Sequence, residues 1–278
     1  NILTYHVISV NDGGNINTTL NFNEDYLING VNLVDSKLLF FTDNYNPPRF
    51  INTERDYPNP QAAIDAFTAE SILVIKKPPL NSPLVKTLPT SGQNNFLEDK
   101  FISFAYRYKY ADSEYSATSQ FSAPAFIPSP FQFSFAKGLN DGMLNLGNQA
   151  EITYNSGSEL VVGVDLLFKD MNSGTIKVIE KLNKEDLGLF NNTEYTYTFS
   201  DQKIFTILPS SEILRLYDNV PLLSTAQTIM GNRLIYANYL EQRDIVTAGG
   251  FPTQLEYTAD LEANIIGLKD IEEELFAT

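Results

Sequence analysis

The chain contains no cysteine among its 278 residues. Disulfide frameworks, zinc sites built on thiolates and cysteine nucleophiles are therefore excluded. The single histidine, His6, lies in the alternating segment Leu3–Ile8, where a lone histidine is more often structural than catalytic. The sequence has neither the Gly-x-Ser-x-Gly turn of serine hydrolases nor a glycine-rich phosphate loop. We therefore expect a protein that is not an enzyme and that needs no cofactor or metal.

Basic residues are also scarce. The sequence has 19 lysines and arginines against 34 aspartates and glutamates, which gives a net charge of -15. An acidic surface repels phosphate, so direct binding of nucleic acid is not expected, and solubility is the ordinary role of such a charge. No apolar run approaches the roughly 20 residues of a membrane helix, and the first residues lack the basic start of a signal peptide. Since the chain begins at Asn1 without methionine, we expect a piece of a longer protein.

Alternation of apolar and polar residues is the dominant pattern that is present. It runs through 103–110, 162–168 and 194–199, with the aromatic residues of 104–110 all on one face. Turn sequences separate these segments, as in Asn155–Gly157 and Asn172–Gly174. Short strands at this spacing predict a mainly β protein with an immunoglobulin- or fibronectin-like β-sandwich.

The arrangement along the chain predicts an inserted domain. Residues 101–205 are expected to form the sandwich, and the proline- and asparagine-rich segment 78–100 is interpreted as a linker into it. Strand patterns return after a short connecting helix in 206–217. Residues 1–77 and 218–278 are therefore expected to form one outer β-domain, with a propeller as a candidate architecture.

Helices are predicted at few places. Asn59 and Pro60 are typical of a helix start, which gives a short helix over 60–69. Residues 211–217 and the acidic segment 261–276 are further candidates. The prolines of 124–130 predict an exposed connection or an edge strand.

Three patterns resemble functional sites but also fit simpler structural roles. Asn11–Asn15 resembles a calcium loop in composition but lacks the spaced acidic ligands, so a hairpin turn is preferred. Asp112 and Glu114 are a carboxylate pair of the kind that hydrolases use, but two solvated turn residues are the simpler interpretation. The tyrosines of 104–110 are candidates for a sugar-binding platform, while strand spacing favours the sandwich core.

The segment Leu39–Asn52, LFFTDNYNPPRFIN, predicts a strand, a rigid corner and a second strand. Pro47 and Pro48 fix the backbone and remove two hydrogen-bond donors, and Asp43 and Asn46 are suited to closing the turn with their side chains. Arg49 is expected either to brace the corner against an acidic neighbour or to contact another subunit. The role of this motif is architectural in both cases.

Several segments in the same order resemble the tail stabilisation or muzzle proteins of crAss-like podoviruses. They are LFFTDNYNPPRFIN (39–52), FAYRYKYADSEYS (104–116), VDLLFKD (164–170), LYDNVP (216–221) and GNRLIYANY (231–239). The resemblance implies a virion protein of the phage tail that carries no catalytic motif. It also implies a homo-oligomeric ring, expected to be hexameric, at the distal end of the DNA-ejection channel. The tail hub and tail fibres would be partners, and DNA would pass without specific binding along an acidic wall.

Two other functions compete with this structural one. A tail module that binds or depolymerises host-surface carbohydrate would place exposed aromatic residues beside paired carboxylates. A bacterial adhesin would repeat its sandwich, and the sequence has no internal repeat. The structural role in the tail is therefore the preferred hypothesis.

Overall fold

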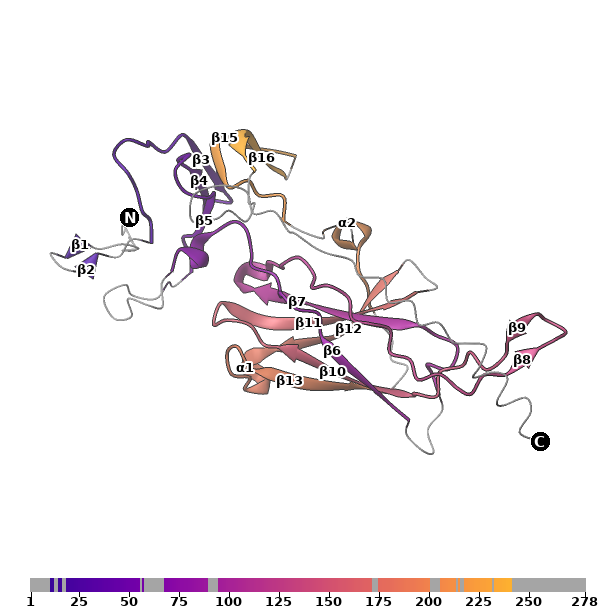
Figure 1. Ribbon diagram of the computed structural model, residues 1–278. Helices are drawn as coiled ribbons and strands as arrows, with labels where there is room; N and C mark the ends of the chain where they lie inside the picture. Colours follow the sequence, from indigo (N-terminus) through magenta and orange to yellow (C-terminus); the bar gives the residue numbers. More distant parts are fainter. Residues whose placement is uncertain are drawn as a thin grey trace, which may run out of the picture. The chain divides into compact units, whose positions relative to one another are not determined.

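The computed structural model describes residues 11–12, 15–16, 19–55, 57, 68–89, 95–171, 175–200, 206–213, 215, 218–231 and 233–241. Over these residues the protein is mainly β and consists of several separate antiparallel sheets (Figure 1). The mainly β class predicted from the alternation is confirmed.

Two sheets form a β-sandwich. The first has the strand order β13–β10–β6, with bounds Glu194–Phe199, Gln149–Asn155 and Leu84–Leu88. The second has the order β14–β12–β11–β7, with bounds Thr206–Ile207, Ile176–Asn183, Val161–Asp170 and Ile102–Tyr110. A short helix, α1 (Lys184–Leu187), joins β12 to the loop before β13. This order differs from the ABED and CFG sheets of an immunoglobulin constant domain, so the immunoglobulin-like part of the prediction is not confirmed.

The core of the sandwich lies between the two sheets. Phe104, Tyr106, Tyr108 and Tyr110 of β7 all belong to it, together with apolar residues of β10, β11, β12 and β13. Alternate residues of β7 point inward, and the ring of Phe104 contacts Phe199 edge-on at 5.6 Å between centroids. The interpretation of the 104–110 aromatic residues as core is confirmed.

The open edge of β7 is covered by a chain segment with a period of three rather than two. Ser116, Ser119 and Ser122 each bond both backbone groups of one β7 residue. Their N–H groups donate to β7 carbonyls at 2.8–3.0 Å, and their hydroxyl oxygens accept the N–H of Phe104, Tyr106 or Tyr108 at 3.0 Å. The serines therefore satisfy an edge that would otherwise be available to pair with another chain.

The outer face of the four-stranded sheet carries a second, smaller core. Ala105, Leu167, Ile176, Val178 and Leu208 are buried there. Phe121 and Ile213, the latter in the short helix α2 (Ser210–Ile213), pack against them. Both faces of β7 are therefore buried, unlike the half-exposed strand that simple alternation would predict.

The outer module unites segments from both ends of the described chain. A three-stranded sheet contains β3 (Gly30–Val34), β4 (Leu38–Thr42) and β5 (Arg49–Asn52). The hairpin of β15 (Leu223–Met230) and β16 (Arg233–Leu240) lies against it. Thr42 donates a buried hydrogen bond of 2.7 Å to the carbonyl of Ser224, which lies 182 residues later. Gly30 is required at this contact because a Cβ would come within 2.6 Å of the Gln227 side chain.

Lys76 lies at the connection between the outer module and the sandwich. Its ammonium group pairs with Glu114 at 3.0 Å, and it donates to the carbonyl of Leu73 at 2.8 Å. It also lies within 6 Å of the rings of Phe50 in the outer module and Tyr110 in the sandwich. One buried cation thus contacts both modules.

The short elements complete the description. β1 (Asn11–Asp12) pairs with β2 (Asn15–Ile16), as the hairpin interpretation of Asn11–Asn15 predicts. The 3₁₀ turns η1 and η2 span Ala69–Ile72 and Ala111–Ser113. β8 (Phe133–Ser134) and β9 (Leu139–Asn140) form a hairpin in the long connection between β7 and β10.

Part of the predicted linker is a strand. Residues Leu84–Leu88 form β6, which pairs with β10, so 78–100 is not a linker throughout. Pro83 and Pro89 flank this strand without interrupting its hydrogen bonds. The proline-rich composition of the segment therefore indicated a linker although five of its residues form a strand. Residues 206–217 likewise contain β14 as well as the four-residue α2. The remaining domain boundaries stay predictions.

The other predicted helices fall largely beyond the described residues. Residues 60–67 of the first helix lie outside them, and Ala69 belongs to η1. The segment 261–276 lies wholly outside the described residues. The propeller interpretation of the outer domain also stays a prediction.

Candidate functional site

The corner between β4 and β5 is closed by the side chains that the sequence singled out. Asp43 Oδ1 accepts the backbone N–H of Tyr45 at 3.0 Å and of Asn46 at 2.7 Å. Asp43 Oδ2 accepts the side-chain amide of Asn46 at 2.6 Å. Asn44 between them adopts a positive φ of 57°, which asparagine tolerates better than most residues. The turn is therefore held by one carboxylate that replaces three backbone or water partners.

The same corner is fastened to an earlier segment of the chain. The side-chain amide of Asn21 donates to Asn46 Oδ1 at 2.9 Å, and the side-chain amide of Asn46 donates to the backbone carbonyl of Asn21 at 3.0 Å. Pro47 is partly buried and Pro48 is buried, so neither extends the corner into solvent. These contacts hold the corner between β4 and β5 together, and its architectural role stays a prediction.

Arg49 is enclosed within its own chain. Its side chain donates from Nη1 to the carbonyl of Leu20, and the residue is only 3% exposed. Burial lowers the pKa of the Arg49 guanidinium, while the charge of Asp43 opposes that shift. The bracing role is the one that these contacts support, and a contact of Arg49 with another subunit stays a prediction.

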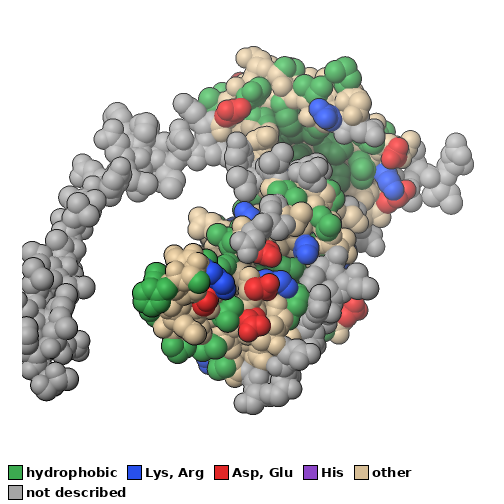
Figure 2. All heavy atoms as spheres, turned by 90° about the vertical axis from the view of Figure 1, so that its right-hand side faces the viewer, with side chains coloured by type: hydrophobic (Ala, Val, Ile, Leu, Met, Phe, Trp, Pro, Cys, Tyr) green, Lys and Arg blue, Asp and Glu red, His purple; other side chains and the backbone are tan. Residues whose placement is uncertain are grey.

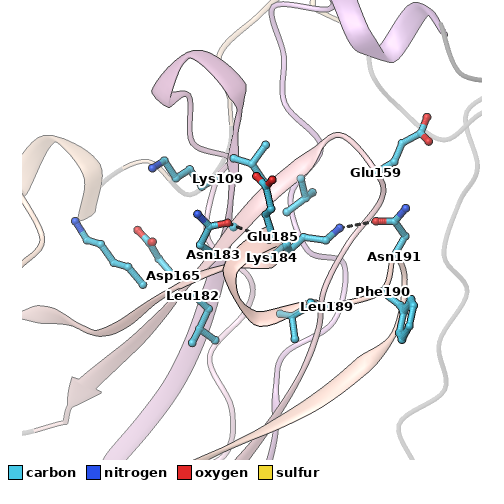
Figure 3. A pocket seen from close by; sticks show the side chains of 15 residues that line it. Lys109, Glu159, Asp165, Leu182, Asn183, Lys184, Glu185, Leu189, Phe190 and Asn191 are labelled. Carbon is cyan, nitrogen blue, oxygen red and sulfur yellow. Dashed lines mark hydrogen bonds between the residues drawn. The ribbon is translucent and has the colours of Figure 1, made fainter. Parts of the chain in front are cut away.

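A hollow of about 660 Å³ lies on the sandwich beside α1 (Figure 3). Asn183 caps α1 by accepting the N–H of Glu185 at 3.0 Å, and Gly188 ends the helix in the left-handed conformation. Gly163 lies on the hollow's wall, where a Cβ would meet the Leu182 carbonyl at 2.7 Å. A side chain at this position would collide with the backbone of the neighbouring strand β12, so the close approach of β11 and β12 here requires glycine.

Lys184 is the buried cation of this hollow. Its ammonium group donates to Asn191 Oδ1 at 2.7 Å (Figure 3). It also donates to the carbonyls of Ser158 at 2.8 Å and Gly157 at 3.4 Å. Burial lowers the pKa of Lys184, and Glu159 opposes that shift. Because three oxygens already surround the ammonium group, it ties two loops together and is not positioned as a base or an anion-binding group.

Asp165 lies at one side of the hollow and is paired across the sheet. Arg107 donates from Nε at 3.1 Å and from Nη2 at 3.0 Å to Asp165 Oδ2, and its Nη1 binds Glu212. The guanidinium also stacks on Tyr115 at 4.0 Å. Burial raises the pKa of Asp165 in spite of Arg107. This network anchors α2 to the sheet and leaves Asp165 committed to a structural partner.

Lys184 and Asp165, which both line this hollow, are bound by other residues of the chain. No group of three or more histidine, cysteine, aspartate or glutamate residues able to hold a metal occurs among the residues that the structure describes. A second hollow of about 560 Å³ lies at one end of the sandwich core and includes Tyr106, Tyr108, Tyr110 and Tyr154 in its wall. Asn192 and Glu194 supply polar groups to it.

Most of the remaining sequence candidates lie outside the described side chains. Glu114 of the proposed carboxylate pair is bound by Lys76, and the Asp112 side chain is outside the described structure. His6 also lies outside the described residues. Sequence reasoning did not identify the serines of 116–122 or Lys76 as structurally important, although the spacing Ser-x-x-Ser-x-x-Ser could have indicated the serines.

The sequence matches no protein-family model and no curated protein. Within the part of the chain that the structure describes, no helix is both long and apolar enough to cross a membrane.

Proposed function

We propose that this chain is a structural component of a short phage tail. In this proposal, copies form an oligomeric muzzle- or nozzle-like ring that lines and closes the distal end of the DNA-ejection channel. The ring is taken as hexameric, and the tail hub and tail fibres as its neighbours. The chain acts as a wall and mechanical gate rather than as an enzyme.

The observation that carries the proposal is the ordered set of segments that resembles the muzzle proteins. Three of these segments correspond to framework elements: 39–52 supplies β4, the corner and β5, 104–116 includes most of β7, and 231–239 includes most of β16. The polar groups in them bind within the chain, as Asp43 and Arg107 do. Residues used for framework in this way favour an architectural role over a catalytic one.

The test uses purified particles of the phage that encodes the chain. Antibodies against the sandwich should label the distal end of the tail, and quantitative mass spectrometry should find a fixed copy number per particle close to six. Absence of the protein from washed particles would refute the proposal. A fixed copy number other than six would correct only the ring order.

The second hollow favours one alternative function, a carbohydrate-binding tail module. Four tyrosines beside Asn192 and Glu194 combine aromatic rings with polar side chains, as sugar sites do. Calorimetry with host-surface oligosaccharides tests this function. Binding that is lost in Glu194→Gln and kept in the distant control Glu54→Gln would support it, whereas no heat of binding at millimolar sugar would exclude it.

A further inference from the structure

The β8–β9 hairpin and the residue stretch just before it carry three phenylalanines that the described part of the chain leaves exposed. Phe131, Phe133 and Phe135 are 75%, 46% and 91% exposed, and their rings contact one another in sequence. Leu139 and Met143 add exposed fractions of 50% and 54%. Figure 2 views the molecule from the side on which this hairpin lies in Figure 1, and hydrophobic side chains reach the surface there. We call these five residues the aromatic prong.

The prong is held in shape by its own hydrogen bonds. Asn140 Oδ1 accepts the N–H of Gln132 at 2.8 Å and of Gly142 at 3.0 Å. At the base, the buried Asn145 accepts the N–H of Ile127 and donates to the carbonyl of Ala125. A partner would therefore meet preformed rings, and binding would require little additional ordering.

The prong lies in a part of the chain that carries almost no charge. Residues 115–150 contain one lysine and one aspartate, Lys137 and Asp141, which pair at 3.2 Å, in a protein of net charge -15. Aromatic residues and methionine without surrounding charge are the composition of interface cores. Copies of an acidic chain repel each other where their acidic surfaces meet, so this neutral segment is suited to contact another copy.

A second uncharged apolar surface lies on the outer module. Residues 26–34 contain no charged side chain, and Leu27, Ile28, Val31 and Leu33 are 45–74% exposed. β3 is also at the edge of its sheet, with Val31 and Leu33 on the face opposite to Asn32. Edge strands usually carry a proline, a charge or a bulge that prevents pairing, and β3 has no proline or charge. We call these four residues the β3 patch.

We propose that the aromatic prong of one copy docks on the β3 patch of the next copy. The contact joins two different surfaces, so it is heterologous and can close into a ring when the rotation between copies allows. A self-pairing of two prongs would leave the β3 patch exposed and would stop at a dimer. The inference rests on the proposed assembly of copies and specifies the surfaces that form it.

The experiment uses two variants of the full chain, each with one surface disabled. Phe133→Asp with Phe135→Asp removes the prong, and Val31→Asp with Leu33→Asp removes the β3 patch. Phe190→Asp is the matched control, because Phe190 is 76% exposed but lies outside both surfaces. Melting curves establish that each variant is folded, and mass photometry with sedimentation gives the distribution of assemblies.

The wild-type chain and the control should assemble, and each variant alone should be monomeric. An equimolar mixture of the two variants should give heterodimers and nothing larger, since one intact prong and one intact patch remain available. The dissociation constant of that heterodimer should rise at least 100-fold when either remaining surface is also changed.

Other outcomes overturn the inference. Assembly of the prong variant alone overturns it while leaving the proposed tail function intact, and so does a mixture that stays monomeric. A monomeric wild-type chain also overturns it, and labelling of particles then decides the tail function separately. Binding of the wild-type chain, but not the prong variant, to neutral lipid vesicles without self-assembly would identify a membrane as the occupant instead. A lower melting temperature of the patch variant, with unchanged assembly, would show that other residues of the same chain cover β3.

Discussion

Replacing Asp43 by alanine tests whether one buried carboxylate holds the β4–β5 corner. Asp43 is 2% exposed and accepts hydrogen bonds of 2.6, 2.7 and 3.0 Å, all from the turn that follows it. Its loss leaves buried donors on Asn46 without an acceptor, and it leaves the buried Arg49 without the nearby negative charge. We expect the free energy of unfolding to fall by about 3–5 kcal/mol, since hydrogen bonds to a charged group and the pairing of a buried charge both contribute.

Two companion variants locate the cause. Asp43→Asn keeps an oxygen that can accept from the backbone N–H groups. It removes the charge, however, and places its own NH₂ group against the side-chain NH₂ group of Asn46, so about half of the loss in unfolding free energy is expected. Asp25→Ala is the control, because Asp25 is an exposed aspartate of the same module, and a change within about 0.5 kcal/mol is expected.

The assay is urea unfolding, combined with hydrogen exchange of peptides from 39–52. The exchange of the Tyr45 and Asn46 amides should accelerate in Asp43→Ala well before that of β7. If Asp43→Ala unfolds within 0.5 kcal/mol of the wild type and its corner amides stay protected, the prolines alone fix the corner and our reasoning is wrong.

Four further perturbations follow from the same structure. Ser119→Ala should cost about 1–2 kcal/mol in urea unfolding, since a buried β7 amide loses its second contact with the covering segment. Lys76→Met should cost about 2–3 kcal/mol and accelerate hydrogen exchange in both modules, because a buried cation shared by them is lost. Gly30→Ala should cost about 1–3 kcal/mol and release 223–240 to exchange, because the Cβ would lie 2.6 Å from Gln227. Burial raises the pKa of Asp165 in the folded protein, so the contribution of this carboxyl group to stability is fully present below about pH 4 and is lost as the pH rises through the folded pKa. The free energy of unfolding of the wild type minus that of Asp165→Asn should therefore fall from pH 4 to pH 7, and a rise would contradict this sign.

The sequence predicted the parts of the fold that follow simple rules. Alternation placed Phe104 and its neighbours in a core, and the Asp/Asn-Pro-Pro chemistry placed a closed corner after Thr42, because both depend on neighbouring residues. It also led to the expectation that segments before and after the sandwich belong together, and the Thr42–Ser224 hydrogen bond joins two such segments.

Other features depended on contacts that the local pattern does not contain. The covering segment of β7 has a period of three, which matches neither a strand nor a helix, so the Ser-x-x-Ser-x-x-Ser spacing was its only signal in the sequence. Leu84–Leu88 was hidden by its flanking prolines. Alternation alone does not indicate that the outer face of β7 is buried, as it is by contacts with Ile213 of α2 and by the Arg107–Asp165 pair. The burial of Arg49 against Leu20 was equally invisible, because 29 residues separate them.

Electron cryo-microscopy of intact particles tests the tail function most directly. The account predicts a ring of identical copies at the distal end of the tail, with the two-sheet sandwich of 84–207 recognisable in each copy and the axis of the ring along the DNA channel. A purified chain that remains a monodisperse monomer, together with particles whose tail density contains no copy of this sandwich, would contradict it.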